Sequence, residues 1–357
     1  MINVTKTFLP QQEEYQAILK EAWDTGWITN RGVLVKRLEE QLKQVLGVPH
    51  IIAMTNGTLP LQIAIKALGL KGDIITTPFS YVASTSSIVW EGCNPVFVDI
   101  NPDYLTIDET KIEAAITSKT SAILATHVFG NPCNVEVIEN IAKKHNLKVI
   151  YDAAHCFGVT YKGKSIFKYG DVSSCSFHAT KLFHTGEGGA IFANSVELYE
   201  KLFYYHNFGH DGTLKFHGLG INAKMSEPQA AMGLAVLPYM KAILAERKRI
   251  VDYYNQHLNL SMLKRLKLRE QTNWNFSYYP VVFESEEKLL EVEKALNDQQ
   301  ILPRRYFYPS LETLPYINEK KCMISSDISK RILCLPLSHN LEKNELIKIS
   351  NLINAIL

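Results

Sequence analysis

From about residue 48 to residue 195 the chain alternates between two hydrophobic patterns. Short runs rich in β-branched residues predict strands, and the longer stretches between them, with apolar residues three and four positions apart, predict helices. This alternation is typical of a mostly parallel sheet covered by helices, with ligands beyond the carboxyl ends of the strands. The predicted strands fall within the segments HIIAMTNG, DIITTP, NPVFVDI, SAILATHVFG, LKVIYDAAH, SSCSFHATK and GGAIFAN.

Two of the predicted helices follow a residue that suits the position before a first helical turn. LPLQIAIKALG comes after Thr58, and VEVIENIAKKHN comes after Asn134. A third stretch, residues 226–257, is rich in helix formers and is broken only by Pro238. Its length suits a connection between two domains.

The C-terminal residues mix both patterns and predict a small α+β domain. A chain of 357 residues with 46% hydrophobic content favours one large and one smaller domain, placed here at residues 1–240 and 241–357. Strands are expected near residues 275–285 and 332–340, and helices near 285–298 and 342–356.

Charge and apolar content exclude several classes of partner. With 38 basic and 36 acidic residues the formal charge is +2, and no long basic run is present, so a nucleic-acid partner is not expected. No apolar run approaches the ~18 residues of a membrane span, and the first residues do not resemble a secretion signal, so we expect a cytoplasmic protein. The six cysteines lack a C-x-x-C pair, which favours buried thiols over disulfides or zinc.

Two segments after predicted strands carry polar groups suited to a phosphorylated ligand. The flexible turn Thr55–Thr58 and the helix that follows can hold a phosphate, although an ordinary turn capped by Thr58 is an equal alternative. In YDAAH, the carboxylate of Asp152 can pair with a protonated pyridine nitrogen. The alternatives there are a helix cap for Asp152 and a core position for His155.

Two further segments complete the set. In SFHATK, followed by TGEGG, Lys181 can reach a cleft and form a Schiff base with an aldehyde, and Ser176 offers a hydroxyl to the same phosphate. A surface lysine is the alternative. Residues 220–225 alone would suit a loop and the start of a helix. Taken together, the four segments favour pyridoxal 5′-phosphate (PLP) as cofactor.

These segments resemble the DegT/DnrJ/EryC1/StrS family of sugar aminotransferases, a branch of the aspartate-aminotransferase PLP enzymes. The resemblance implies a fold type I PLP-dependent transferase: a large domain with a mostly parallel seven-stranded sheet between helices, and a small α+β C-terminal domain. It covers nearly the whole chain, through FLPQQEEY, GWITNRG, GTLPLQIAIKALGL, PFSYVASTSSIVWEG, FVDINPDYLTID, HVFGNPCNVEVIENIAKKHNLKVIYDAAHCFG, SFHATKLFHTGEGG, INAKMSEPQAAMGL, RRYFYPSLETLPY and CLPLSHNL.

The resemblance also implies roles for individual residues. Lys181 would form the Schiff base and move protons, and Asp152 would bind the pyridine nitrogen. Asn222 would reach the phosphate of the neighbouring subunit, which makes a homodimer the smallest active unit, while Lys224 stands where the family often has arginine. The remaining cofactor contacts are expected from Gly57, Thr58 and Ser176 at the phosphate, and from Tyr81, His155 and His178 at the ring.

The implied activity is the transfer of an amino group from L-glutamate to a nucleotide-linked keto sugar. The expected substrate is dTDP-4-dehydro-6-deoxy-D-glucose, which gives a 4-amino-4,6-dideoxy sugar for surface polysaccharide such as O-antigen. A UDP-linked 4-keto sugar or a 3-keto sugar is the alternative. Lys224, Arg305 and Tyr308 are candidates to face the substrate, although Arg304 and Arg305 also suit a solvated pair.

Other functions can be built from the same residues. Ser176, a histidine and Asp152 suit a hydrolase triad, but the G-x-S-x-G turn is missing and Lys181 would have no role. A dinucleotide site would need a G-x-G-x-x-G after the first strand, which is absent. Family dehydratases carry histidine in place of the lysine, and a PLP-binding regulator stays open. A metal site is conceivable from His206, His210 and His217, although the nearby glycines favour a loop.

Overall fold

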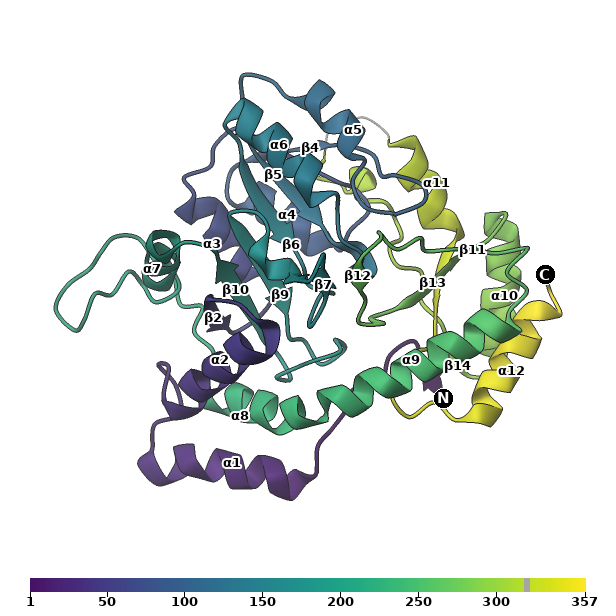
Figure 1. Ribbon diagram of the computed structural model, residues 1–357, viewed down its shortest axis with the longest axis horizontal. Helices are drawn as coiled ribbons and strands as arrows, with labels where there is room; N and C mark the ends of the chain where they lie inside the picture. The colour runs from purple at the N-terminus through teal and green to yellow at the C-terminus, as the bar shows by residue number, and fades with distance from the viewer. Residues whose placement is uncertain (318–321) are drawn as a thin grey trace.

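The computed structural model describes residues 1–317 and 322–357, and a seven-stranded sheet forms its centre (Figure 1). Its strands are β2 (His50–Met54), β3 (Asp73–Thr76), β4 (Asn94–Phe97), β5 (Thr120–Thr126), β6 (Lys148–Asp152), β9 (Val172–Ser176) and β10 (Gly189–Ala193). They lie in the order β2-β10-β9-β6-β5-β3-β4, and only β10 is antiparallel to its neighbours. The predicted strands and the mostly parallel sheet are confirmed.

Consecutive residues of these strands enter two different hydrophobic cores, because side chains alternate between the faces of a sheet. Ile51 and Ile123 join one core, while the next residues, Ile52 and Leu124, join the other. Helices cover both faces. The first core includes residues of α1 (Gln12–Thr25), α2 (Val33–Leu46), α6 (Val135–His145) and α8 (Glu227–Val236), and the second includes residues of α3 (Leu59–Ala67), α4 (Val82–Trp90) and α7 (Val196–Tyr205).

A long helix joins the sheet to the C-terminal part (Figure 1). The expected break at Pro238 is confirmed, because this residue lies in a 3₁₀ turn between α8 and α9 (Met240–His257). Arg247 of α9 is buried and donates hydrogen bonds to the carbonyl oxygens of Phe276, Ser277 and Leu337. One side chain thus holds the helix against two separate segments.

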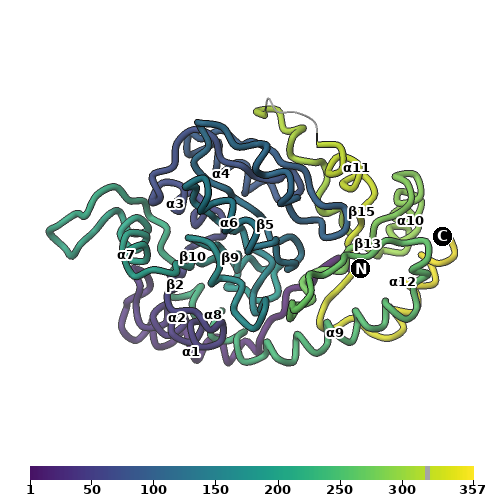
Figure 2. The backbone as a smooth tube through the Cα atoms, turned by 45° about the horizontal axis from the view of Figure 1, so that its top comes forward, coloured from purple at the N-terminus to yellow at the C-terminus, as the bar shows by residue number. Residues whose placement is uncertain are grey.

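The C-terminal part is α+β, as predicted. Strand β13 (Tyr279–Val282) pairs antiparallel with β11 (Lys264–Arg265) and β15 (Ile332–Leu335). The N-terminus also lies here, because β1 (Ile2–Asn3) pairs in parallel with β14 (Ile301–Leu302) (Figure 2). The helices of this part are α10 (Glu286–Asp298), α11 (Met323–Arg331) and α12 (Lys343–Asn354).

The remaining elements are short. They are α5 (Glu109–Ile112), β7 (Thr160–Tyr161), β8 (Lys164–Ser165) and β12 (Thr272–Asn273). Strand β7 pairs antiparallel with both β8 and β12. All six cysteines are buried, as expected. Among the described residues, no helix combines the length and the apolar character needed to cross a membrane.

Aromatic residues join the carboxyl edge of the large sheet to the C-terminal part. Phe129 follows β5, and its ring lies parallel to that of Phe307, with centroids 5.8 Å apart. Phe79, after β3, meets Phe307 edge-on at 5.6 Å. These buried contacts fix residues 304–307 opposite the ends of the parallel strands.

Candidate active site

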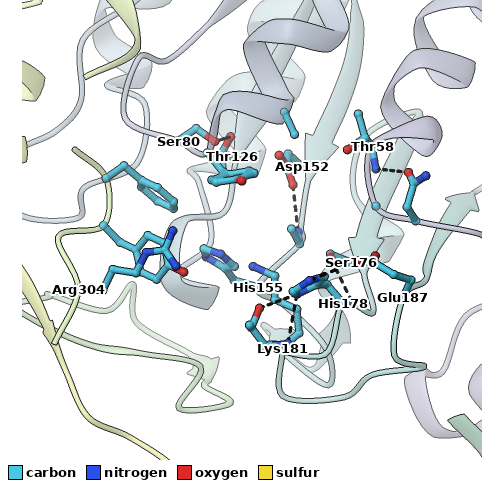
Figure 3. Close-up of a pocket in the computed structure, with 18 residues that line it drawn as sticks. Thr58, Ser80, Thr126, Asp152, His155, Ser176, His178, Lys181, Glu187 and Arg304 are labelled. Carbon is cyan, nitrogen blue, oxygen red and sulfur yellow. Dashed lines mark hydrogen bonds and ion pairs between the residues drawn. The ribbon is translucent and has the colours of Figure 1, made fainter. Parts of the chain in front are cut away.

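A cavity of about 240 Å³ opens between the carboxyl ends of the central strands and residues 304–307 (Figure 3). This is where an α/β sheet is expected to bind a ligand. Eight of the nine residues predicted to bind or react with the cofactor line it; Asn222 does not. The full lining is Asn56, Gly57, Thr58, Ser80, Tyr81, Ala83, Thr126, Asp152, Ala154, His155, Ser176, His178, Thr180, Lys181, Glu187, Arg304, Tyr306 and Phe307.

The turn after β2 forms one end of this cavity. Oδ1 of Asn56 accepts hydrogen bonds from the N–H groups of Thr58 and Leu59, both at 2.9 Å, so Asn56 rather than Thr58 caps α3. A Cβ atom at Gly57 would lie 2.8 Å from Cβ of Ser176, so glycine is required for this close approach. The hydroxyls of Thr58 and Ser176 therefore border the cavity at the start of a helix, where a phosphate is favoured.

Asp152 ends β6, and hydrogen bonds hold its carboxylate. The Ser84 hydroxyl donates to Oδ2 at 2.6 Å, and the N–H of Ala154 donates to Oδ1 at 3.1 Å. Burial raises the pKa of Asp152, while these two donors and the charge of Lys181 act to lower it. The donors favour the ionised form, which can pair with a protonated ring nitrogen.

Ser84 belongs to a chain of hydroxyl groups that the sequence reasoning missed. The Oγ atom of Ser80 lies 2.7 Å from Oγ of Ser84 and 3.0 Å from Oγ1 of Thr126. The signal was present in the run ASTSS at residues 83–87, because hydroxyl residues are poor choices for a buried helix without partners. This series of hydrogen-bonded hydroxyl groups orients the Asp152 carboxylate through Ser84.

His155 lies beside the cavity as a neutral ring. Its Nδ1 accepts a hydrogen bond of 3.1 Å from the N–H of Phe129, so Nε2 carries the proton. Burial lowers the pKa of His155 well below its usual range, and the charge of Lys181 lowers it further. Its ring is parallel to that of Phe307, with centroids 5.8 Å apart. The hydrogen bond and the ring contact thus hold the His155 ring in a fixed orientation in the cavity wall.

Lys181 follows β9 in a tight loop whose backbone is closed by a 2.8 Å hydrogen bond from its own N–H to the carbonyl of His178. Its side chain enters the cavity, with Nζ 5.9 Å from the ring centroid of Tyr278. Burial lowers the pKa of Lys181, although Tyr306 and Asp152 raise it. Burial therefore increases the fraction of neutral amine, which is the form that attacks an aldehyde.

His178 and Glu187 form the outer margin near Lys181 (Figure 3). Nδ1 of His178 accepts a hydrogen bond of 3.2 Å from the N–H of Thr180, so the proton of the neutral ring is on Nε2. That nitrogen lies 3.4 Å from Oε1 of Glu187. Glu187 belongs to the TGEGG segment that follows SFHATK, and it was not among the residues predicted to bind the cofactor.

The model of the DegT/DnrJ/EryC1/StrS aminotransferase family matches residues 10–354. The chain belongs to this family. The predicted resemblance is confirmed, together with the fold class, the assignment to nucleotide-sugar aminotransferases and the PLP cofactor. The cavity fits that cofactor, because it joins a helix start suited to phosphate, a carboxylate for a ring nitrogen and a lysine amine for an aldehyde.

Two curated relatives and one solved structure illustrate the likeness. A dTDP-4-amino-4,6-dideoxy-D-glucose transaminase from Shigella dysenteriae is 42% identical over 99% of both chains. A transaminase of the same name from Escherichia coli is 37% identical and covers 99% of this chain and 98% of its own. The crystal structure of DesI in the presence of its TDP-sugar product is 30% identical, covers 99% of this chain and 92% of that chain, and has a TM-score of 0.94.

Asn222 and Lys224 of this aminotransferase lie outside the cavity of their own chain. Nζ of Lys224 donates to Oδ1 of Asn222 at 2.7 Å and lies 4.7 Å from the ring centroid of Phe208. Asn222 pairs with Asn207 at the base of the loop that follows α7, and Lys224 pairs with Met54 of β2. The loop itself extends away from the rest of the protein (Figure 1). That loop exposes large apolar side chains, among them Phe208, Leu214, Phe216 and Leu219.

In the RRYFYP segment, the sequence analysis expected Arg305 and Tyr308 to face the substrate. The structure instead brings Arg304 and Tyr306 to the cavity. Arg305 donates to Glu286 at 2.6 Å and to the carbonyl of Lys330 at 2.8 Å, and its guanidinium lies 3.8 Å from the ring centroid of Tyr308. Arg304 lines the cavity instead. The reason is that Arg304 is paired through both backbone groups with Cys334, which points adjacent side chains in opposite directions.

The rival sites are not assembled. Nδ1 of His155 and Nδ1 of His178 each accept a hydrogen bond from a backbone amide, so neither histidine can donate to Asp152 as a Ser176 triad requires. In the described part of the chain, no three His, Cys, Asp or Glu residues are grouped to hold a metal ion. The three histidines of the HNFGHDGTLKFH segment pack on separate aromatic rings, those of Phe203, Phe216 and Tyr204.

Proposed function

We propose that this enzyme moves the amino group of L-glutamate onto dTDP-4-dehydro-6-deoxy-D-glucose and forms dTDP-4-amino-4,6-dideoxy-D-glucose. The observation that carries the chemistry is the meeting of Lys181 and the buried Asp152 carboxylate in one cavity. The substrate rests on the names of the Shigella dysenteriae and Escherichia coli relatives.

The proposed cofactor contacts follow from the lining. Gly57, Thr58 and Ser176 hold the phosphate, and Asp152 keeps the pyridine nitrogen protonated. Tyr81 and His155 would hold the pyridine ring, and His178 and Glu187 line the same cavity. When bound, PLP accepts the electrons released at the carbon bearing the amine.

Lys181 is the proposed proton carrier. With PLP bound, the neutral amine of Lys181 would take the proton from the α carbon of the donor and hold it inside the cavity for the transfer. In the second half of the reaction the same amine would give a proton to the sugar carbon that receives the amino group. Burial lowers the pKa of Lys181, which increases the fraction of neutral amine available for these steps.

The substrate is tested by offering L-glutamate with one keto sugar at a time to the PLP-loaded enzyme and measuring the amino sugar by mass spectrometry. The dTDP-linked 4-keto-6-deoxy sugar is expected to react fastest. Faster reaction of a UDP-linked 4-keto sugar or of a 3-keto sugar would assign the alternative substrate. Absence of any amino sugar would favour a PLP-binding regulator.

A cytoplasmic location and a role in O-antigen or other surface polysaccharide stay predictions.

The active unit is proposed to be a homodimer in which Asn222 of one subunit completes the phosphate site of the other. The position of Asn222 outside its own cavity, on a loop with exposed apolar residues, supports this. Subunits carrying Lys181→Ala are to be mixed, after partial unfolding and refolding, with subunits carrying Asn222→Ala. A hybrid dimer holds one intact site, so about a quarter of wild-type activity should return. No recovery would contradict shared sites.

A further inference from the structure

A second cleft, of about 590 Å³, opens beside the active-site cavity. The N-terminal residues 3–7 form one wall, and residues 302–304 form the other. Arg304 and Thr180 line both spaces, so the outer cleft begins next to Lys181. A ligand that reacts at Lys181 and is longer than the inner cavity would extend into this cleft.

The walls of the cleft are fixed by backbone pairing. Strands β1 and β14 run in parallel, so the residues that follow them leave the pair in the same direction. The carbonyl of Val4 accepts a 2.9 Å hydrogen bond from the N–H of Leu337, and the Thr7 hydroxyl donates to the carbonyl of Ala179 at 2.9 Å. The N-terminal segment is therefore tied to the loop that carries Lys181.

The charge of the cleft is positive. Lys6 and Arg304 are its charged lining residues, and the lining contains no carboxylate. Arg304 lies over the ring of Tyr306, 4.6 Å from its centroid, and no carboxylate in the described chain is paired with it. The adjacent Arg305 is neutralised by Glu286. One of two neighbouring arginines is thus left available to an anion.

We propose that this cleft binds the diphosphate of the nucleotide-linked substrate, with Lys6 and Arg304 as its cations. The inference rests on the proposed function. The keto carbon must reach Lys181, and the sugar ring separates that carbon from the phosphates, so the sugar occupies the inner cavity and the diphosphate lies farther out. Two cations without a carboxylate match the two charged phosphoryl groups.

The test measures binding of dTDP, and of thymidine as its uncharged counterpart, by calorimetry. The PLP-loaded proteins are the wild type, Lys6→Gln, Arg304→Gln and the matched control Arg305→Gln. Each cleft variant should lose about tenfold in affinity for dTDP, the strength of one charge-assisted contact, and keep its affinity for thymidine. The control should bind dTDP as the wild type does. Wild-type affinity for dTDP in both cleft variants would overturn the proposal.

Two further measurements keep the outcome clear. Raising the salt concentration should weaken binding of dTDP to the wild type and leave thymidine unaffected, and this needs no variant; salt-independent binding of dTDP would overturn the proposal. If Arg304→Gln weakens binding of 2-oxoglutarate instead of dTDP, the arginine serves the donor carboxylate and the proposal is also wrong. Failure of the proposed function is recognised separately, as absence of amino sugar with dTDP binding intact.

Discussion

The Ser84 hydroxyl donates a 2.6 Å hydrogen bond to the carboxylate of Asp152, so a residue of α4 stabilises the charge at the end of β6. Burial raises the pKa of Asp152, and this bond is the first of the effects that oppose the rise. The pairing of the carboxylate with a pyridine nitrogen therefore depends on a side chain that does not line the cavity.

Replacing Ser84 by alanine should weaken PLP binding by about tenfold, the usual value of one hydrogen bond to a charged group. The reason is that the pKa of Asp152 rises further when the bond is lost, so the loss should be larger at pH 6 than at pH 8. Ser86→Ala is the control, because within the described residues that hydroxyl bonds only to the carbonyl of Ala83 in the same helix. Dissociation constants from cofactor fluorescence test this. Equal effects of the two variants would argue against the role of Ser84.

Gly57→Ala should lower PLP affinity and destabilise the protein by about 1–3 kcal/mol, the usual cost of overpacking. Its new Cβ would lie 2.8 Å from Cβ of Ser176, so one of the two segments must move. Gly57→Ala combined with Ser176→Gly removes the two shortest contacts, those with Cβ and Oγ of Ser176, and leaves the Cα atom at 3.1 Å, so it should recover part of the lost stability. Urea unfolding of the three proteins decides the point. A double variant no more stable than Gly57→Ala would show that the contact is not the cause.

Much of the fold followed from local pattern. The seven central strands and the break at Pro238 depend on hydrophobic spacing and on proline, which act within a few residues. The reversed direction of β10 and the pairing of β1 with β14 were not predictable in this way, because they are set by contacts between residues far apart in the chain. The division at residue 240 stays a prediction, and the first strand runs with the C-terminal part.

The site shows the same limit. Lys181 and Asp152 were found because chemistry restricts those positions to one residue type. Arg304 was missed in favour of Arg305, because two adjacent arginines are alike in sequence and only the pairing with Cys334 decides which one faces the cavity. The roles of Ser80 and Ser84 were not predicted, because serine is common in helices, turns and loops that have no role in a binding site.

Buried histidines should make the protein less stable in acid. Burial lowers the pKa of His127 to about 3 and that of His206 to about 4. The unfolded chain takes up these protons near pH 6.5 and the folded chain does not, so stability present above that pH is lost as the pH falls. Each group should cost about 2 kcal/mol between pH 7 and pH 5.

The contribution of His127 is isolated by a variant. His127→Asn keeps an acceptor for the N–H of Cys133, which His127 binds at 2.9 Å, and should remove about 2 kcal/mol of the loss between pH 7 and pH 5. Urea unfolding of the cofactor-free protein at the two pH values measures the difference. The control, His257→Asn on the exposed end of α9, should keep the wild-type pH dependence. The account is wrong if His127→Asn also keeps it.

Arg247→Met should destabilise the protein by about 3 kcal/mol or more, because three buried carbonyl groups lose their donor. Lys248→Met, one position along α9, removes only an exposed ion pair with Asp252 and should cost less than about 0.5 kcal/mol. Chemical unfolding compares the two. Similar losses would mean that the carbonyl contacts of Arg247 do not stabilise the junction with α9.

The most direct test of the central claim is the absorbance spectrum of the PLP-loaded protein after L-glutamate is added. In the wild type the cofactor should change from its aldehyde-derived form to its amine form, and the dTDP-linked keto sugar should reverse the change. Lys181→Ala should show neither change within the same time, because no group is left to carry the proton. An unchanged wild-type spectrum, or an equally fast change in Lys181→Ala, would contradict the account.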